Sequence, residues 1–122
     1  MIPRPLRIAA FALACAVVAW ASLAPARSLP SADVSDKIEH AGAYFVLAAL
    51  AAWAWPRQRL TKLGAWLFAA GVGVEVLQGL MALGRQGDPA DALANSAGIA
   101  LGLLAALAIR EANRVKSHAE GE

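Results

Sequence analysis

Charged residues are scarce in this chain. Asp, Glu, Lys and Arg make up only 16% of its 122 residues, whereas 59% are hydrophobic. Soluble domains carry about 25% charged residues, which they need to cover their surface, so the composition excludes an ordinary water-soluble fold. The 11 basic and 9 acidic residues leave a net charge of +2. They form no basic patch or stripe, so no nucleic-acid partner is predicted.

Cysteine is almost absent, and internal repeats are lacking. The single Cys15 cannot form an internal disulfide, so it carries no information about the redox compartment. A chain of this length normally makes one domain. We therefore predict a single domain over residues 1–122.

The hydrophobic residues are gathered into four blocks, which predict an all-α integral membrane bundle of four transmembrane helices. A helix rises about 1.5 Å per residue, so 18 residues reach roughly 27 Å, close to the hydrocarbon thickness of a bilayer. The second block reaches that length only if its helix begins near Asp36, which puts His40 in an early turn. The predicted helices cover about residues 6–24, 36–55, 63–83 and 91–109, followed by a cytoplasmic tail at 110–122.

Basic residues predict the orientation of this bundle, because Lys and Arg in short loops are retained in the cytoplasm. With both termini cytoplasmic, eight basic residues lie on the inner side and three on the outer side. The second and fourth helices then run inward and the third runs outward. Five polar residues are thereby placed in the outer half of the bundle: His40, Glu75, Gln78, Asp91 and Asn95.

The first block has an alternative interpretation as a secretory signal peptide. Arg4 and Arg7, an apolar run and the small-residue triplet 24–26 resemble such a peptide with its cleavage site. The apolar segment 8–24 is longer than the usual core of about 7 to 15 residues, and Pro25 makes a poor cleavage context. Cleavage would leave three spans with their orientation unchanged.

One face of the predicted second helix is polar. Asp36, His40 and Tyr44 recur every four residues, and Lys37 precedes Tyr44 by seven, so the four side chains share an arc of about 100°. Histidine is suited to proton transfer near neutral pH, which makes His40 the candidate proton shuttle. Alternatively, the acids favour the helix dipole while Lys37 and Tyr44 anchor the helix at the membrane interface.

The predicted third helix carries a polar pair within its apolar block. Glu75 and Gln78 share a face with Gly71, and Glu75 lies roughly 12 Å below the predicted outer end at helical rise. A carboxylate facing lipid at that depth would cost several kcal/mol, so Glu75 is expected to face the bundle interior, paired or protonated. A structural buried carboxylate is the alternative to a functional one.

The fourth helix combines polar and small residues on one stripe. Asp91, Asn95, Gly98 and Gly102 follow spacings of four, three and four. The two glycines form a small-xxx-small motif that lets a neighbouring backbone approach, and the asparagine can donate and accept across that interface. Asp91 can alternatively cap the helix start. Arg85, in the preceding loop, has a planar fork suited to a carboxylate or phosphate.

These spaced residues resemble the VanZ-like family of bacterial membrane proteins over about residues 33–106. The matching segments are Asp36-Lys37-x-x-His40-x-x-x-Tyr44, Glu75-x-x-Gln78, and Arg85 followed by Asp91-x-x-x-Asn95-x-x-Gly98-x-x-x-Gly102. The loop 84–89 lacks the aromatic residues that some members carry. The resemblance implies a small multi-pass protein of the bacterial cytoplasmic membrane, in a family named after a member associated with resistance to teicoplanin. It implies no particular reaction.

Two functions from different classes follow. In the first, an outward site binds or modifies a lipid-linked or cell-wall substrate; His40, Glu75 and Asp91 are the candidate catalytic residues. The substrate-binding candidates are Asp36, Lys37, Tyr44, Gln78, Arg85 and Asn95, of which Lys37 or Arg85 would hold an anionic head group. In the second, the polar stripes join helices, Gly71, Gly98 and Gly102 serve packing, and the protein associates with another envelope protein.

Two further possibilities are weaker. Proton-coupled transport would need a polar route through the inner halves of the helices, which the sequence lacks. A metal site built from Asp36, His40, Glu75 and Asp91 is chemically possible, but no single segment has a ligand spacing that demands one. We therefore predict no metal and no cofactor, with membrane lipids as the general partner.

Overall fold

The computed structural model describes residues 1–24, 36–81 and 88–121, and these form four α-helices with no strand among them. The helices are α1 (Arg4–Leu23), α2 (Asp36–Ala54), α3 (Leu60–Met81) and α4 (Pro89–Ala119). The all-α prediction is confirmed. Arg85 and the end of the predicted third helix lie outside the described residues, as does most of the candidate cleavage triplet 24–26.

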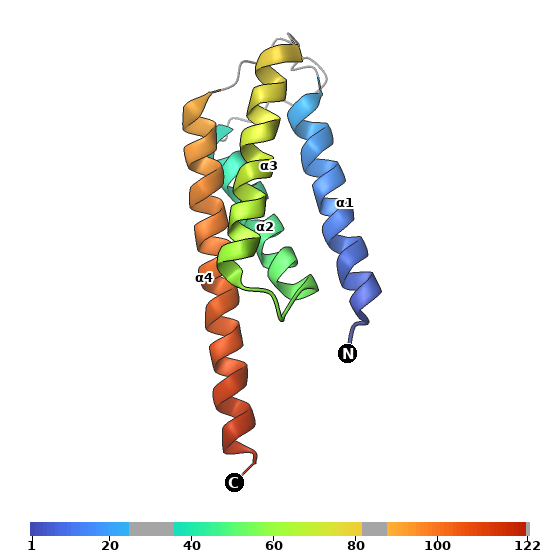
Figure 1. Ribbon diagram of the computed structural model, residues 1–122, viewed down its shortest axis with the longest axis vertical. Coiled ribbons are helices and arrows are strands. Elements are labelled where there is room, and N and C mark those ends of the chain that lie inside the picture. The colour runs from blue at the N-terminus through green and yellow to red at the C-terminus, as the bar shows by residue number, and fades with distance from the viewer. Residues whose placement is uncertain (25–35, 82–87, 122) are drawn as a thin grey trace.

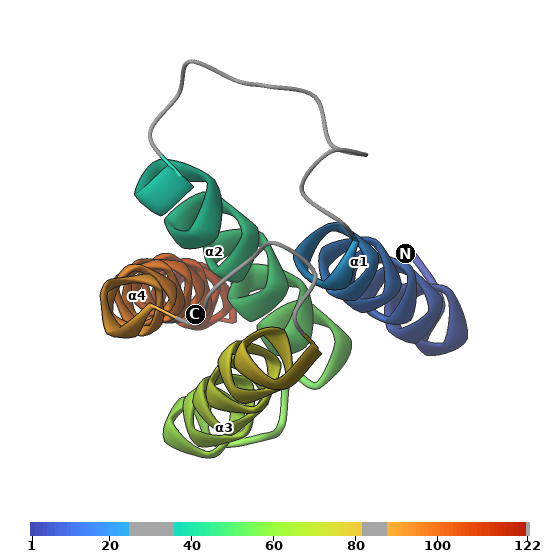
Figure 2. The same ribbon diagram turned by 90° about the horizontal axis from the view of Figure 1, so that it is seen from above.

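The helices alternate in direction along one long axis. Both termini and the turn between α2 and α3 lie toward one end of the molecule, whereas α3 ends and α4 begins at the other (Figure 1). Seen along this axis, α2 lies between the other three helices (Figure 2) and contacts each of them. The first turn of α2 therefore lies toward the same end as the start of α4.

The interface between α2 and α4 depends on two glycines. A Cβ atom added to Gly98 would lie 2.9 Å from the carbonyl carbon of Ala41 and closer still to its oxygen. A Cβ atom on Gly102 would lie 2.6 Å from the carbonyl oxygen of Phe45. Both glycines are buried, as is Gly71 on α3, which packs against the Tyr44 ring. The predicted stripe of Gly98 and Gly102 on α4 therefore lets the backbones of α2 and α4 come into close contact.

The fourth helix is longer than its apolar block. The segment 110–119, predicted to be part of a tail, is helical, and α4 ends at Ala119. This final stretch is exposed and carries ion pairs between Arg114 and Glu111 at 2.8 Å and between Lys116 and Glu120 at 3.7 Å. Oppositely charged side chains three or four residues apart are neighbours on the helix surface. Such ion pairs stabilise this stretch of helix, which has no apolar side to pack against the bundle.

Arg110 ties the middle of α4 to the end of α2. Its guanidinium group donates to the backbone oxygens of Ala52, Trp55 and Gln58 at 3.1 to 3.4 Å. The last carbonyl groups of a helix have no hydrogen-bond partner within the helix and carry partial negative charge. A guanidinium group at that end donates hydrogen bonds to these carbonyls and offsets their charge.

Large apolar side chains cover the outside of the bundle. Large apolar residues more than 60% exposed occur on all four helices, among them Leu13, Trp20, Ile38, Trp66 and Leu93. Soluble monomers rarely expose continuous apolar surface of this kind. Helices α1, α3 and α4 are each long and apolar enough to cross a membrane. The fold therefore has the surface expected of a membrane protein.

Candidate functional site

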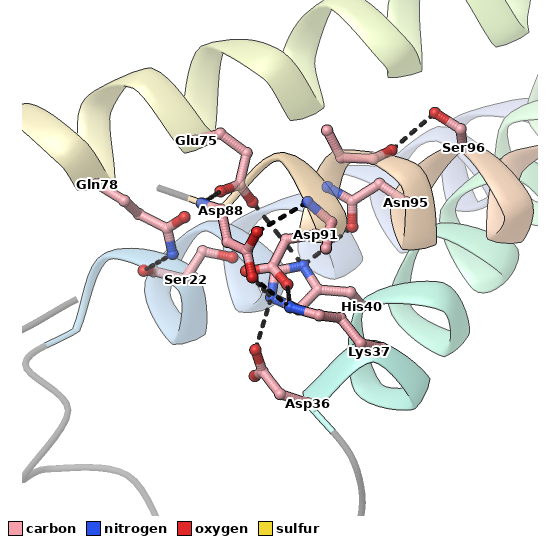
Figure 3. Close-up of polar contacts among 12 residues, drawn as sticks. Ser22, Asp36, Lys37, His40, Glu75, Gln78, Asp88, Asp91, Asn95 and Ser96 are labelled. Carbon is pink, nitrogen blue, oxygen red and sulfur yellow. Dashed lines mark hydrogen bonds and ion pairs between the residues drawn. The ribbon is translucent and has the colours of Figure 1, made fainter. Parts of the chain in front are cut away.

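Polar side chains from α2, α3 and α4 meet at the end of the bundle where α4 begins (Figure 3). We call this group the polar cluster, and it consists of Asp36, Lys37, His40, Glu75, Asp88, Asp91 and Asn95. Glu75, Asp91 and Asn95 are each at most 9% exposed. The convergence predicted from helical spacing is therefore present among the described residues.

Lys37 is held by two carboxylates from the start of α4. Its ammonium group bonds Asp88 Oδ2 at 2.8 Å and also Asp91 Oδ1. The lysine lowers the pKa of Asp88 below its usual range, and the hydrogen bond from the Ala90 backbone N–H acts in the same direction. Asp88 is therefore ionised at neutral pH. A lysine engaged in this way is poorly placed to hold an anionic head group.

The capping residue of α4 is Asp88, and not Asp91, for which capping was an alternative role predicted from the sequence. Asp88 is the N-cap and its side chain accepts a hydrogen bond at 2.9 Å from the N–H of Ala90, with Pro89 in the first helical position. Asp91 lies one turn further and points at Lys37 and His40. Lys37 pairs with both Asp88 and Asp91. Asp88 therefore belongs to the polar cluster, although the residue spacing in the sequence did not identify it.

His40 lies among oxygen atoms from three helices. Its Nδ1 atom is 3.0 Å from Asn95 Oδ1 and 4.0 Å from Glu75 Oε1. Its Nε2 atom is 3.6 Å from Asp91 Oδ2 and 3.8 Å from Asp36 Oδ2. The ring is only 12% exposed, whereas Asp36 is mostly exposed at the rim.

Glu75 faces the bundle interior, as its predicted depth required. Its Oε2 atom accepts a hydrogen bond of 3.2 Å from the backbone N–H of Asp88. Its Oε1 atom is buried and has no hydrogen-bond partner among the described residues. The partner is thus the backbone at the start of α4, which no pattern of side chains in the sequence could indicate.

Two other candidates lie apart from the centre of the cluster. Gln78 donates to the backbone oxygen of Ser22 on α1 at 2.7 Å, and thereby links α1 to α3. Tyr44 is buried in the hydrophobic core with Leu47 and Leu67. These positions assign Gln78 and Tyr44 mainly to helix packing in this structure.

The polar cluster has an excess of negative charge. Four carboxylates, on Asp36, Glu75, Asp88 and Asp91, surround one ammonium group, on Lys37. Carboxyl groups therefore outnumber ammonium groups by four to one in the described part of the polar cluster. Such a group attracts cations and hydrogen-bond donors and repels bare phosphate.

Two pockets lie at the opposite end of the bundle. One, of about 280 Å³, is lined mainly by apolar residues, including Phe11, Trp55 and Trp66. The other, of about 470 Å³, is lined by arginines together with Trp55. Neither includes a residue of the polar cluster.

Comparison with known proteins gives no match: no family model, curated protein or solved structure is significantly similar to this chain.

Proposed function

We propose that the chain is a VanZ-like protein of the bacterial cytoplasmic membrane, with four spans and cytoplasmic termini. The positive residues near the termini and in the α2–α3 turn support this orientation. The termini and the α2–α3 turn lie toward the end of the molecule opposite the start of α4 (Figure 1), and the polar cluster lies at the start of α4. In this arrangement the cluster faces the outer side of the membrane.

The role proposed for the cluster is to bind a lipid-linked or cell-wall compound. The observation that carries this proposal is the meeting of buried polar side chains from three separate helices, where each ionisable group is costly to keep in a membrane. Because acceptor oxygens predominate, the bound portion is expected to be rich in hydroxyl or ammonium donors. Sugars and amino groups of cell-wall material have this character.

A growth assay tests the proposed role. Expression of the chain in a teicoplanin-susceptible bacterium is expected to raise the teicoplanin concentration that stops growth, or to change the level of lipid-linked precursors. His40→Ala, Glu75→Gln and Asp91→Asn are each expected to abolish that effect, because they remove groups at the centre of the cluster. Growth is measured over a teicoplanin series, and precursors by mass spectrometry of extracted lipids.

The matched control is His118→Ala, which removes an exposed histidine near the end of α4. It is expected to behave as the unmodified chain does. Wild-type behaviour of all three cluster variants, each inserted at normal abundance, would overturn the proposed role.

An alternative function is a non-enzymatic module that associates with another envelope protein. The favouring observation is that several polar contacts also join helices, such as His40 with Asn95 and Gln78 with Ser22. Under this alternative, the cluster variants lose membrane abundance or thermal stability together with any phenotype. Normal abundance with a lost phenotype favours the binding site instead.

A further inference from the structure

We propose that Asp36, His40 and Asp91 bind a divalent transition-metal ion such as zinc. This inference goes beyond the proposed function and does not depend on it, since it concerns a cation and not an envelope compound. It also departs from the expectation of no metal that the sequence supported, because the ligands come from two helices and share no local motif.

The three ligand atoms are already close together. One nitrogen of His40 and one oxygen each of Asp36 and Asp91 lie within 4.8 Å of one another. The distances from His40 Nε2 to the two carboxylate oxygens are 3.6 and 3.8 Å. Two atoms bound to one zinc ion at about 2.1 Å lie roughly 3.4 Å apart in tetrahedral geometry. The two carboxylate oxygens lie at most 4.8 Å apart, and rotation of the exposed Asp36 side chain can bring them to the tetrahedral separation.

The hydrogen bond between His40 Nδ1 and Asn95 leaves Nε2, the ring nitrogen that faces Asp36 and Asp91, available to bind a metal ion. Asn95 Oδ1 is a carbonyl oxygen that can only accept, so the proton of His40 Nδ1 is directed at it. In the neutral ring Nε2 then presents a lone pair to two carboxylate oxygens, an arrangement that repels unless a cation lies between them. A metal-bound histidine commonly donates its other ring N–H to an oxygen in this way.

Glu75 places a further carboxylate oxygen near the other nitrogen of the His40 ring. It is 9% exposed, and its Oε1 atom, 4.0 Å from His40 Nδ1, is buried and has no hydrogen-bond partner in the described part of the chain. An added positive charge at the neighbouring ring would stabilise that oxygen. Lys37 cannot supply it, because its ammonium group is bound to Asp88 and to the other oxygen of Asp91.

The donor set favours zinc over the hard cations. Imidazole nitrogen suits zinc and its neighbours in the first transition row, whereas magnesium and calcium prefer oxygen ligands alone. Three protein ligands would leave a fourth zinc position open to water or another ligand, as in catalytic zinc sites.

Zinc titration of the purified full chain tests the site. Chain stripped with a chelator in detergent is expected to bind one zinc ion per molecule by isothermal titration calorimetry, and magnesium is expected not to compete. Asp36→Asn is the most informative variant because Asp36 is exposed and its ion pair among the described residues is with His40, itself a proposed ligand. We expect at least about tenfold weaker zinc binding with an unchanged unfolding temperature. His40→Ala should abolish binding.

Glu39→Gln is the matched control, since it removes an exposed carboxylate from the same turn of α2 without touching the three ligands. His118→Ala removes the other histidine. Both should leave zinc affinity unchanged. The proposal is overturned if the unmodified chain binds no zinc, if Asp36→Asn binds as tightly as Glu39→Gln, or if His118→Ala weakens binding as much as His40→Ala does.

Discussion

Gly98→Ala is expected to destabilise the chain by about 2 kcal/mol or more, because its new methyl group has no space. The added Cβ would clash with the carbonyl group of Ala41, which is backbone and cannot rotate away. Relief requires α2 and α4 to separate, and these two helices carry His40 and Asp91. The variant should therefore also lose zinc binding and any effect in the growth assay. The free energy of unfolding is measured by denaturation in mixed detergent micelles.

Gly73→Ala and Gly42→Ala are the matched controls. A Cβ atom at either position would meet nothing within 4 Å, although Gly42 is next to Ala41 on the same helix. Both variants are expected to unfold at the same denaturant concentration as the unmodified chain or slightly later, since alanine favours helix over glycine. Equal stability of Gly98→Ala and Gly42→Ala would show that the two helices are not in close backbone contact.

Lys37→Met is expected to lower the free energy of unfolding, because it removes the ammonium partner of the buried Asp91 side chain. The loss is smaller than for a fully buried ion pair, because the lysine side chain is 40% exposed and water screens part of the effect. The double variant Lys37→Met/Asp91→Asn should recover part of the loss, since it no longer buries an unpaired charge.

The comparison variant for Lys37 is Lys116→Met. Lys116 also pairs with a carboxylate, that of Glu120 at 3.7 Å, but both side chains are more than two-thirds exposed. Its replacement is expected to change stability by no more than about 0.5 kcal/mol. A Lys37→Met variant as stable as Lys116→Met would mean that the pair with Asp91 contributes nothing to the fold.

Much of the fold could be predicted from the sequence because its signals are repeated along the helices. Apolar blocks locate four helices, and spacings of three and four residues correctly place Glu75 and Asn95 toward the interior. The spacing of Gly98 and Gly102 similarly predicts a packing stripe on α4. In the structure this stripe packs against α2. These features depend on periodicity, which a single sequence displays fully.

Other features could not be predicted from the sequence, because they depend on backbone groups or on tertiary contacts. Glu75 accepts from the N–H of Asp88, and Gln78 donates to the carbonyl of Ser22; any residue type could supply either backbone group. The sharing of Lys37 between Asp88 and Asp91 requires knowing where α4 begins. The extension of α4 to Ala119 lacks an apolar stripe, and only its charged pairs signal a helix.

The central claim is that the polar cluster faces the outside of the cell. It is tested most directly by thiol labelling in intact cells, with Cys15 replaced by alanine and one cysteine introduced at either end of the bundle. Glu39→Cys places an exposed thiol beside the cluster, and Ala112→Cys places one on the exposed part of α4. A maleimide that cannot cross the cytoplasmic membrane should label position 39 in intact cells and position 112 only after permeabilisation. The reverse pattern would place the cluster in the cytoplasm, out of reach of any cell-wall compound.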